Sequence, residues 1–165
     1  MSKGNFYHYF ESKDAVLIEQ FHQIDDYYDK AMKEHPPTAS VCERVLDFIY
    51  TVCDYCENVM GIDMTKIVYM NQISIGEKAG ILIDQNRKIY KIFTKIVRQG
   101  QEKGEFTKDI ECKDMVEIFA SFARSMLYEW CLYDGRIDMK DWARRHLRVL
   151  LNGLRNTENS GAAQP

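Results

Sequence analysis

The residues that could carry chemistry are five cysteines, four histidines and a group of polar and aromatic side chains near the N-terminus. Cys53 and Cys56 form a C-x-x-C pair, but they lie in an apolar helical pattern, with no histidine at a spacing that would complete a zinc site. No histidine stands beside a serine, cysteine or carboxylate pair in a catalytic spacing. We therefore predict reduced, buried cysteines, no metal or other cofactor, and no enzymatic activity.

Residues 2–13 carry the most specific pattern, S-K-G-N-F-Y-H-Y-F-E-S-K. Ser2 can cap a short helix, and Phe6 and Phe10 fall on one face of it at i, i+4. The opposite face offers cationic, amide, phenolic and imidazole donors, which suit a DNA groove. The competing interpretation is an aromatic helix packed on its own domain. The predicted DNA-binding residues are Lys3, Gly4, Asn5, Tyr7, His8, Tyr9 and Lys13.

This pattern resembles the recognition helix and the following helix start of the TetR-type bacterial transcription regulators. The resemblance implies that residues 1–13 are a remnant of a helix-turn-helix DNA-binding head, with positions near base edges and near phosphates. In that family two helices precede the recognition helix, whereas this sequence begins at Met1, directly before Ser2. We therefore expect a DNA operator to be the partner of the full-length form, and the chain as given to be deficient in specific DNA binding.

Composition sets bounds on the rest of the chain. A length of 165 residues with 45% hydrophobic content can bury a core, and a net charge of -3 argues against holding nucleic acid by bulk electrostatics. No apolar run is long enough to cross a bilayer, and Met1 is followed by a polar helix start rather than a signal-peptide core. We predict a cytoplasmic protein with no membrane partner.

Apolar residues recur at helical spacing along the chain, and we find no strand pattern and no internal repeat. Ser40 and Glu43 form a capping box, Asp63 and Asp138 stand at further helix starts, and Gly61 is placed to end a helix. The predicted helices are 12 to about 33, 41 to about 60, 64 to about 74, 81–103, 111 to about 132 and 139–154.

These helices and the resemblance together predict an all-α, TetR-like helical bundle. Residues 14–155 would form the ligand-binding and dimerisation domain, and residues 156–165 a flexible tail. Aromatic and methionine side chains of the middle helices would give an apolar cavity with a few donors, although plain core has the same composition. Few charges flank them, which favours an uncharged or cationic aromatic effector. The predicted ligand-binding residues are Tyr55, Tyr69, Met70, Tyr90, Phe93, Phe122, Met126 and Trp130.

The last two helices are the most apolar part of the chain, and their apolar faces are wider than a single stripe. That width indicates two contacts, one with the chain's own core and one with a second copy across a two-fold axis. The predicted interface residues of this homodimer are Phe119, Ala123, Leu147, Leu150 and Leu154.

The sequence therefore predicts a ligand-responsive, dimeric, DNA-binding transcriptional regulator of TetR type. A small molecule in the core would shift the spacing of two DNA-reading heads. The alternative is a stand-alone helical ligand-binding or dimerisation module that does not act on DNA.

Overall fold

The computed structural model describes residues 13–34, 40–75 and 80–156. Within these ranges every regular element is a helix, and the one β pairing is an isolated antiparallel bridge between Phe106 and Arg155. The all-α prediction is confirmed, and no helix in the described ranges combines the length and apolarity needed to cross a membrane. The helices are α2 (Lys13–Glu34), α3 (Val41–Tyr55), the π-helix η1 (Cys56–Met60), α4 (Gly61–Ile75), the 3₁₀ helix η3 (Ile81–Ile83), α5 (Lys88–Glu102), α6 (Cys112–Leu132) and α7 (Met139–Leu154).

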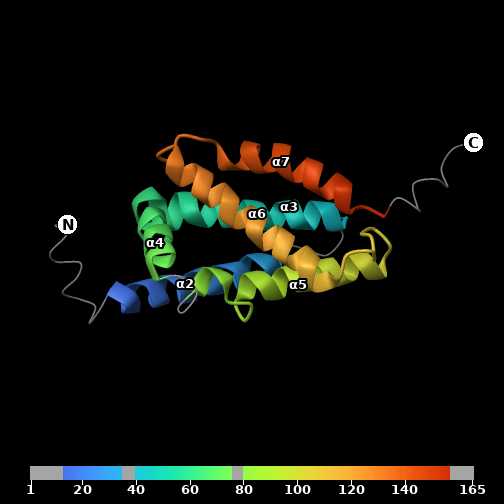
Figure 1. The fold of residues 1–165 in the computed structure, drawn as a ribbon, viewed down its shortest axis with the longest axis horizontal. Helices are drawn as coiled ribbons and strands as arrows, with labels where there is room; N and C mark the ends of the chain where they lie inside the picture. The colour runs from blue at the N-terminus through green and yellow to red at the C-terminus, as the bar shows by residue number, and fades with distance from the viewer. Residues whose placement is uncertain (1–12, 35–39, 76–79, 157–165) are drawn as a thin grey trace, which may run out of the picture.

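The helices form a bundle that is longer than it is wide (Figure 1). Helices α2 and α5 run alongside each other, and α3 packs against α7. Helix α6 crosses the bundle obliquely and contacts α4, α5 and α7, while α4 stands across one end (Figure 1). Helix α6 is therefore the central helix of the bundle.

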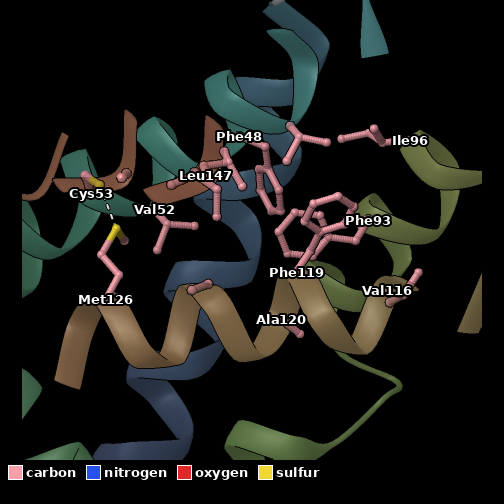
Figure 2. Close-up of a cluster of buried hydrophobic side chains, with 14 of the residues drawn as sticks. Phe48, Val52, Cys53, Phe93, Ile96, Val116, Phe119, Ala120, Met126 and Leu147 are labelled. Carbon is pink, nitrogen blue, oxygen red and sulfur yellow. Dashed lines mark hydrogen bonds between the residues drawn. The ribbon is translucent and has the colours of Figure 1, made fainter. Parts of the chain in front are cut away.

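The core centres on three phenylalanine rings contributed by α3, α5 and α6 (Figure 2). The ring centroids of Phe48 and Phe93 lie 4.9 Å apart in an edge-on contact, and those of Phe93 and Phe119 lie 5.6 Å apart in a stacked contact. All three rings are fully buried, as is Leu147 of α7. Burial of large side chains from four helices is the main favourable contribution to folding, because apolar burial stabilises by roughly 25 cal/mol per Å².

Two of the predicted helix caps are confirmed. The Glu43 backbone N–H donates to Ser40 Oγ at 3.3 Å, and the Ser40 backbone N–H donates to Glu43 Oε2 at 2.8 Å, which completes the capping box. The Asp141 backbone N–H donates to Asp138 Oδ1 at 2.9 Å at the start of α7. These bonds satisfy helix-start donors that would otherwise lack partners.

Two predicted boundaries were wrong. The chain stays helical through η1, and Gly61, at φ +75°, begins α4, so that Asp63 lies in the first turn of α4 and does not cap a later helix. Helix α5 begins at Lys88 and not at residue 81. The reason is local: the Asn86 backbone N–H donates to Asp84 Oδ1 at 2.9 Å, a turn that competes with helix.

The last turns of α5 require glycine at residue 100, because the helix backbone there is in close contact with neighbouring side chains. A Cβ at Gly100 would lie 2.6 Å from Phe106 Cδ2 and 2.9 Å from Val41 Cγ1. We expect Gly100→Ala to lower the free energy of unfolding by about 1–3 kcal/mol, measured by urea denaturation. Gly153→Ala in α7 is the matched control, since a Cβ there meets nothing within 4 Å. Equal stabilities of the two variants would contradict the close packing at Gly100.

Candidate functional site

A cavity of about 40 Å³ lies among α2, α3, α4, α5 and α6. Helices α2 and α6 supply much of its wall, and η3 covers one side with Leu82. The cavity is smaller than the roughly 300–1,000 Å³ of typical ligand sites, so a bound molecule would have to move its walls apart. Its main apolar walls are Ile24, Tyr28, Val52, Val68, Ala120 and Leu127.

Two tyrosines and one arginine supply polar groups on one side of the cavity. Tyr69 Oη donates to the backbone carbonyl oxygen of Arg124 at 2.8 Å. Arg124 Nη1 donates to Tyr90 Oη at 2.7 Å and to the Leu82 carbonyl oxygen at 3.2 Å. Burial raises the pKa of both phenols, although the Arg124 charge opposes this at Tyr90. Both tyrosines are therefore neutral at physiological pH and can serve as hydrogen-bonding groups.

Two other residues of α6 also hydrogen-bond the guanidinium of Arg124. Arg124 Nη2 donates to Glu117 Oε1 at 2.7 Å and to Ser121 Oγ at 2.8 Å. Burial lowers the pKa of Arg124, but the hydrogen bond to Glu117 and the interaction with Tyr90 outweigh that effect and raise it overall. Arg124 is therefore a fixed positive charge at the cavity wall.

A second arginine, Arg87, lines the cavity from the residue that precedes α5. Its Nη2 donates to Asp25 Oδ1 of α2 at 2.9 Å, and its guanidinium lies over the Phe21 ring at 4.5 Å from the centroid. The side chain is 10% exposed, and its buried Nε has no hydrogen-bond partner among the described residues. A buried donor without a partner is uncommon in folded proteins.

Two open grooves lie near this cavity. One, of about 350 Å³, shares Tyr69, Leu82 and Arg124 with the cavity and so lies directly outside it. The other, of about 560 Å³, runs between α2, α3 and α5 and is lined by five cationic side chains and two aspartates. Lys88 pairs there with Asp29, and this hydrogen bond lowers the pKa of the Asp29 carboxyl. Of these two grooves, only the first shares lining residues with the cavity.

Of the predicted ligand-binding residues, Tyr69 and Tyr90 line the cavity. Met70 is 69% exposed, because the helical turn of α4 that brings Val68 and Tyr69 inward carries Met70 outward. Phe122 is half-buried against Trp142, at 5.5 Å between centroids. The remaining four are buried in the core away from the cavity: Tyr55, Phe93, Met126 and Trp130.

The sequence reasoning missed Arg87, Arg124 and Leu82. Arginines in an amphipathic helical pattern ordinarily face solvent, and the pattern alone did not distinguish these two. The sequence did contain one signal for Arg87. Asp84 and Asn86 form a recognisable turn pair, which predicts a break before α5, and this break places Arg87 beside α2.

The predicted dimer residues differ in how far the single chain covers them, and the interface itself stays a prediction. A side chain that the single chain already covers has no surface to give to a second copy. Leu150 alone remains half-exposed. The four buried in the core of the single chain are Phe119, Ala123, Leu147 and Leu154.

The outer faces of α6 and α7 still carry apolar side chains, which we call the outer strip. Val149 is 70% exposed, and Trp142 stacks on the His146 ring at 4.0 Å between centroids. The His146 Nδ1 lies 2.7 Å from the Trp142 carbonyl oxygen, so these two side chains form one surface unit. The members of the outer strip are Ile118, Phe122, Trp142, Val149 and Leu150.

The predicted DNA-binding residues lie outside the described residues, except that Lys13 begins α2. The DNA contacts and the expected deficiency in specific binding therefore stay predictions. Cys53 and Cys56 are buried as predicted, and burial raises the pKa of the Cys53 thiol to about 12. Cys53 Sγ lies 3.6 Å from Met126 Sδ in the core (Figure 2). The other three cysteines are half-buried.

Comparison with known proteins identifies related regulators. The family described as "Tetracyclin repressor-like, C-terminal domain" matches residues 52–154. The chain is similar to the HTH-type transcriptional repressor KstR2 of Rhodococcus jostii (strain RHA1), with 21% identity over 163 residues that span 94% of this chain and 76% of that protein. Its fold is similar to the crystal structure of a bacterial regulatory protein in the tetR family from Rhodococcus RHA1, with a TM-score of 0.65 and 18% identity over 95% of this chain and 82% of the other.

Proposed function

The chain belongs to the TetR family of transcriptional regulators, whose C-terminal domain matches residues 52–154, and from this premise we propose that a small molecule in the buried cavity controls its binding to DNA. The observation that carries the proposal is the position of the cavity. Its lining includes residues of α2, which leads from the predicted DNA-contacting segment, and of α6, and α2 itself packs on α3 and α5. A ligand there has direct access to the helix that would have to move.

The small size of the cavity would couple ligand binding to a movement of α2. A space of about 40 Å³ cannot hold a metabolite unless the helices around it separate. Phe21, Ile24 and Tyr28 all belong to α2, so an entering ligand would displace α2 relative to α6. A ligand that binds the opened arrangement better than the closed one shifts the population toward it, which changes the spacing of two heads in a dimer.

Filling the cavity tests this part of the proposal. Ala123 is buried and lines the cavity, so Ala123→Leu places three further carbons in the space that the ligand would need. We expect the affinity for any small apolar ligand of the wild type to fall by about tenfold or more in calorimetric titration. Lys113→Leu, on the exposed side of α6, is the control and should bind like the wild type. Unchanged affinity in Ala123→Leu would contradict binding at this site.

DNA recognition is proposed to reside in residues 3–13. Immunoprecipitation of the protein expressed from its own gene, followed by sequencing of the bound DNA, should enrich one site with two-fold symmetry. Tyr7→Ala and Lys13→Ala should reduce that enrichment, because each removes one proposed phosphate contact. DNA recovery that never exceeds input would favour a stand-alone helical module. Titration of the purified 165-residue chain at stated salt decides whether this chain is deficient in specific binding.

We also propose a two-fold dimer that buries the outer strip. The outer strip combines an exposed valine with half-exposed aromatic and aliphatic side chains on two adjacent helices, which a second copy could cover. A two-fold pairing covers the same surface on both copies and leaves no open end. The strip keeps the predicted helices α6 and α7 as the interface and replaces four of the five predicted residues.

A further inference from the structure

We infer that the effector carries a carboxylate or a comparable single anionic group, bound between Arg87 and Arg124. The inference rests on the proposed function of the cavity and specifies the chemistry of its ligand. The lining of the cavity contains two guanidinium groups and no carboxylate. Their partners Asp25 and Glu117 are not part of that lining. The charge that faces the cavity is therefore positive and lacks an acidic counterpart within it.

Arg87 is the group that most needs a further partner. Asp25 engages its Nη2, while the buried Nε has no hydrogen-bond partner among the described residues. The side chain is nine-tenths buried and is held over the Phe21 ring, so the guanidinium cannot turn to solvent to satisfy Nε. A carboxylate oxygen in the cavity would accept from Nε and form a short, charge-assisted hydrogen bond.

Arg124 also lines the cavity, and two of its hydrogen-bond partners there are neutral groups. On the cavity side its Nη1 donates to the Tyr90 hydroxyl and to the Leu82 carbonyl oxygen. Its one carboxylate partner, Glu117, contacts Nη2 and is about half exposed, so water weakens that pairing. A ligand carboxylate would compete successfully for Nη1, because charged acceptors bind a guanidinium more strongly than neutral ones.

The remaining walls define the rest of the ligand. Phe21, Val68 and Leu127 offer only apolar surface, so the part of the molecule beyond the anion should be a hydrocarbon chain or ring. Two arginines oppose a cationic ligand. The preference for an uncharged or cationic effector drawn from the sequence is therefore replaced by a small aliphatic or aryl carboxylate.

Matched pairs of acid and alcohol test the inference on the purified protein without DNA. The pairs are hexanoate with hexanol, octanoate with octanol, and phenylacetate with phenylethanol, each titrated by calorimetry. In the wild type we expect at least one acid to bind about tenfold or more tightly than its alcohol. Arg87→Gln and Arg124→Gln should remove that preference, read as the ratio of acid affinity to alcohol affinity within each variant. Arg124→Lys keeps the positive charge and should therefore keep part of the preference for the acid.

Arg98→Gln is the matched control, because Arg98 is exposed on α5 and does not line the cavity. It should retain the full preference for the acid, and circular dichroism should show all variants to be folded. Alcohols that bind as tightly as acids would overturn the carboxylate inference while leaving the cavity as a ligand site. A preference for acids that survives in both glutamine variants would also overturn it. Failure of every acid and alcohol to bind would count against the anion site and the proposed function together.

Discussion

Phe119→Ala is expected to lower the free energy of unfolding by about 3–5 kcal/mol, the largest stability effect of any substitution considered. The ring is fully buried on α6, stacked on Phe93 and 6.0 Å from the Phe106 ring between centroids. The surrounding side chains come from several helices (Figure 2), so they can close only part of the resulting cavity. Urea denaturation followed by circular dichroism measures the change.

Leu132→Ala on the same helix is the control for Phe119→Ala. Leu132 is 59% exposed, so its removal should change the free energy of unfolding by less than about 1 kcal/mol. A loss below about 1.5 kcal/mol in Phe119→Ala would contradict the placement of this ring at the centre of the core.

Val149→Glu is expected to raise the dissociation constant of the dimer by about 100-fold or more. A two-fold interface contains the substituted residue twice, and burying a carboxylate without a partner costs several kcal/mol. The side chain is 70% exposed in the single chain, so the folded monomer should keep its stability. Sedimentation velocity over a range of concentrations measures the dissociation, and thermal denaturation checks the fold.

Ile73→Glu provides the matched control for the dimer. Ile73 is also β-branched and 70% exposed, but it lies on α4, away from the outer strip. The control should sediment like the wild type. Sedimentation of Val149→Glu as a stable dimer would place the interface on another surface, and a monomeric wild type would remove the basis for coupling two heads.

The helical architecture could be predicted because local signals and apolar periodicity agreed. The capping box at Ser40 and the cap at Asp138 each have a side-chain oxygen at the correct position, and both helices begin where these residues indicate. The boundaries near Gly61 and Lys88 failed for a different reason. The π-helix η1 carries the chain into α4 without a break, so Gly61 does not end the helix there. Asp84 and Asn86 form a turn whose residues are visible in the sequence, but the apolar residues 81–83 before it made the predicted helix begin too early.

The candidate site was harder to predict than the fold. Helical spacing identifies buried residues, but it does not show which of them border a space, and so Phe93 and Met126 were grouped with Tyr69 and Tyr90. The same limit affected the dimer, since Phe119 and Leu147 are apolar enough for an interface and are used by the chain's own core. Which apolar face turns outward depends on how α6 crosses its neighbours.

The arginines show a further source of error. The charge of an arginine predicts an exposed side chain. Arg87 and Arg124 nevertheless line the cavity, because Asp25 on α2 pairs with Arg87 and Glu117 on α6 pairs with Arg124. Glu117 and Arg124 lie seven residues apart on α6, whereas Asp25 and Arg87 are distant in the sequence, and only the packing of α2 against α5 brings them together.

The most direct test of the effector site is a crystal structure of the protein bound to the brominated analogue of the tightest-binding carboxylate. We expect the anomalous signal of bromine to lie among the apolar walls near Val68 and Leu127, with the carboxylate between Arg87 and Arg124 and α2 moved away from α6. A bromine site in the lysine-lined groove between α2, α3 and α5, with the central cavity unchanged, would contradict the proposed control of DNA binding through this cavity.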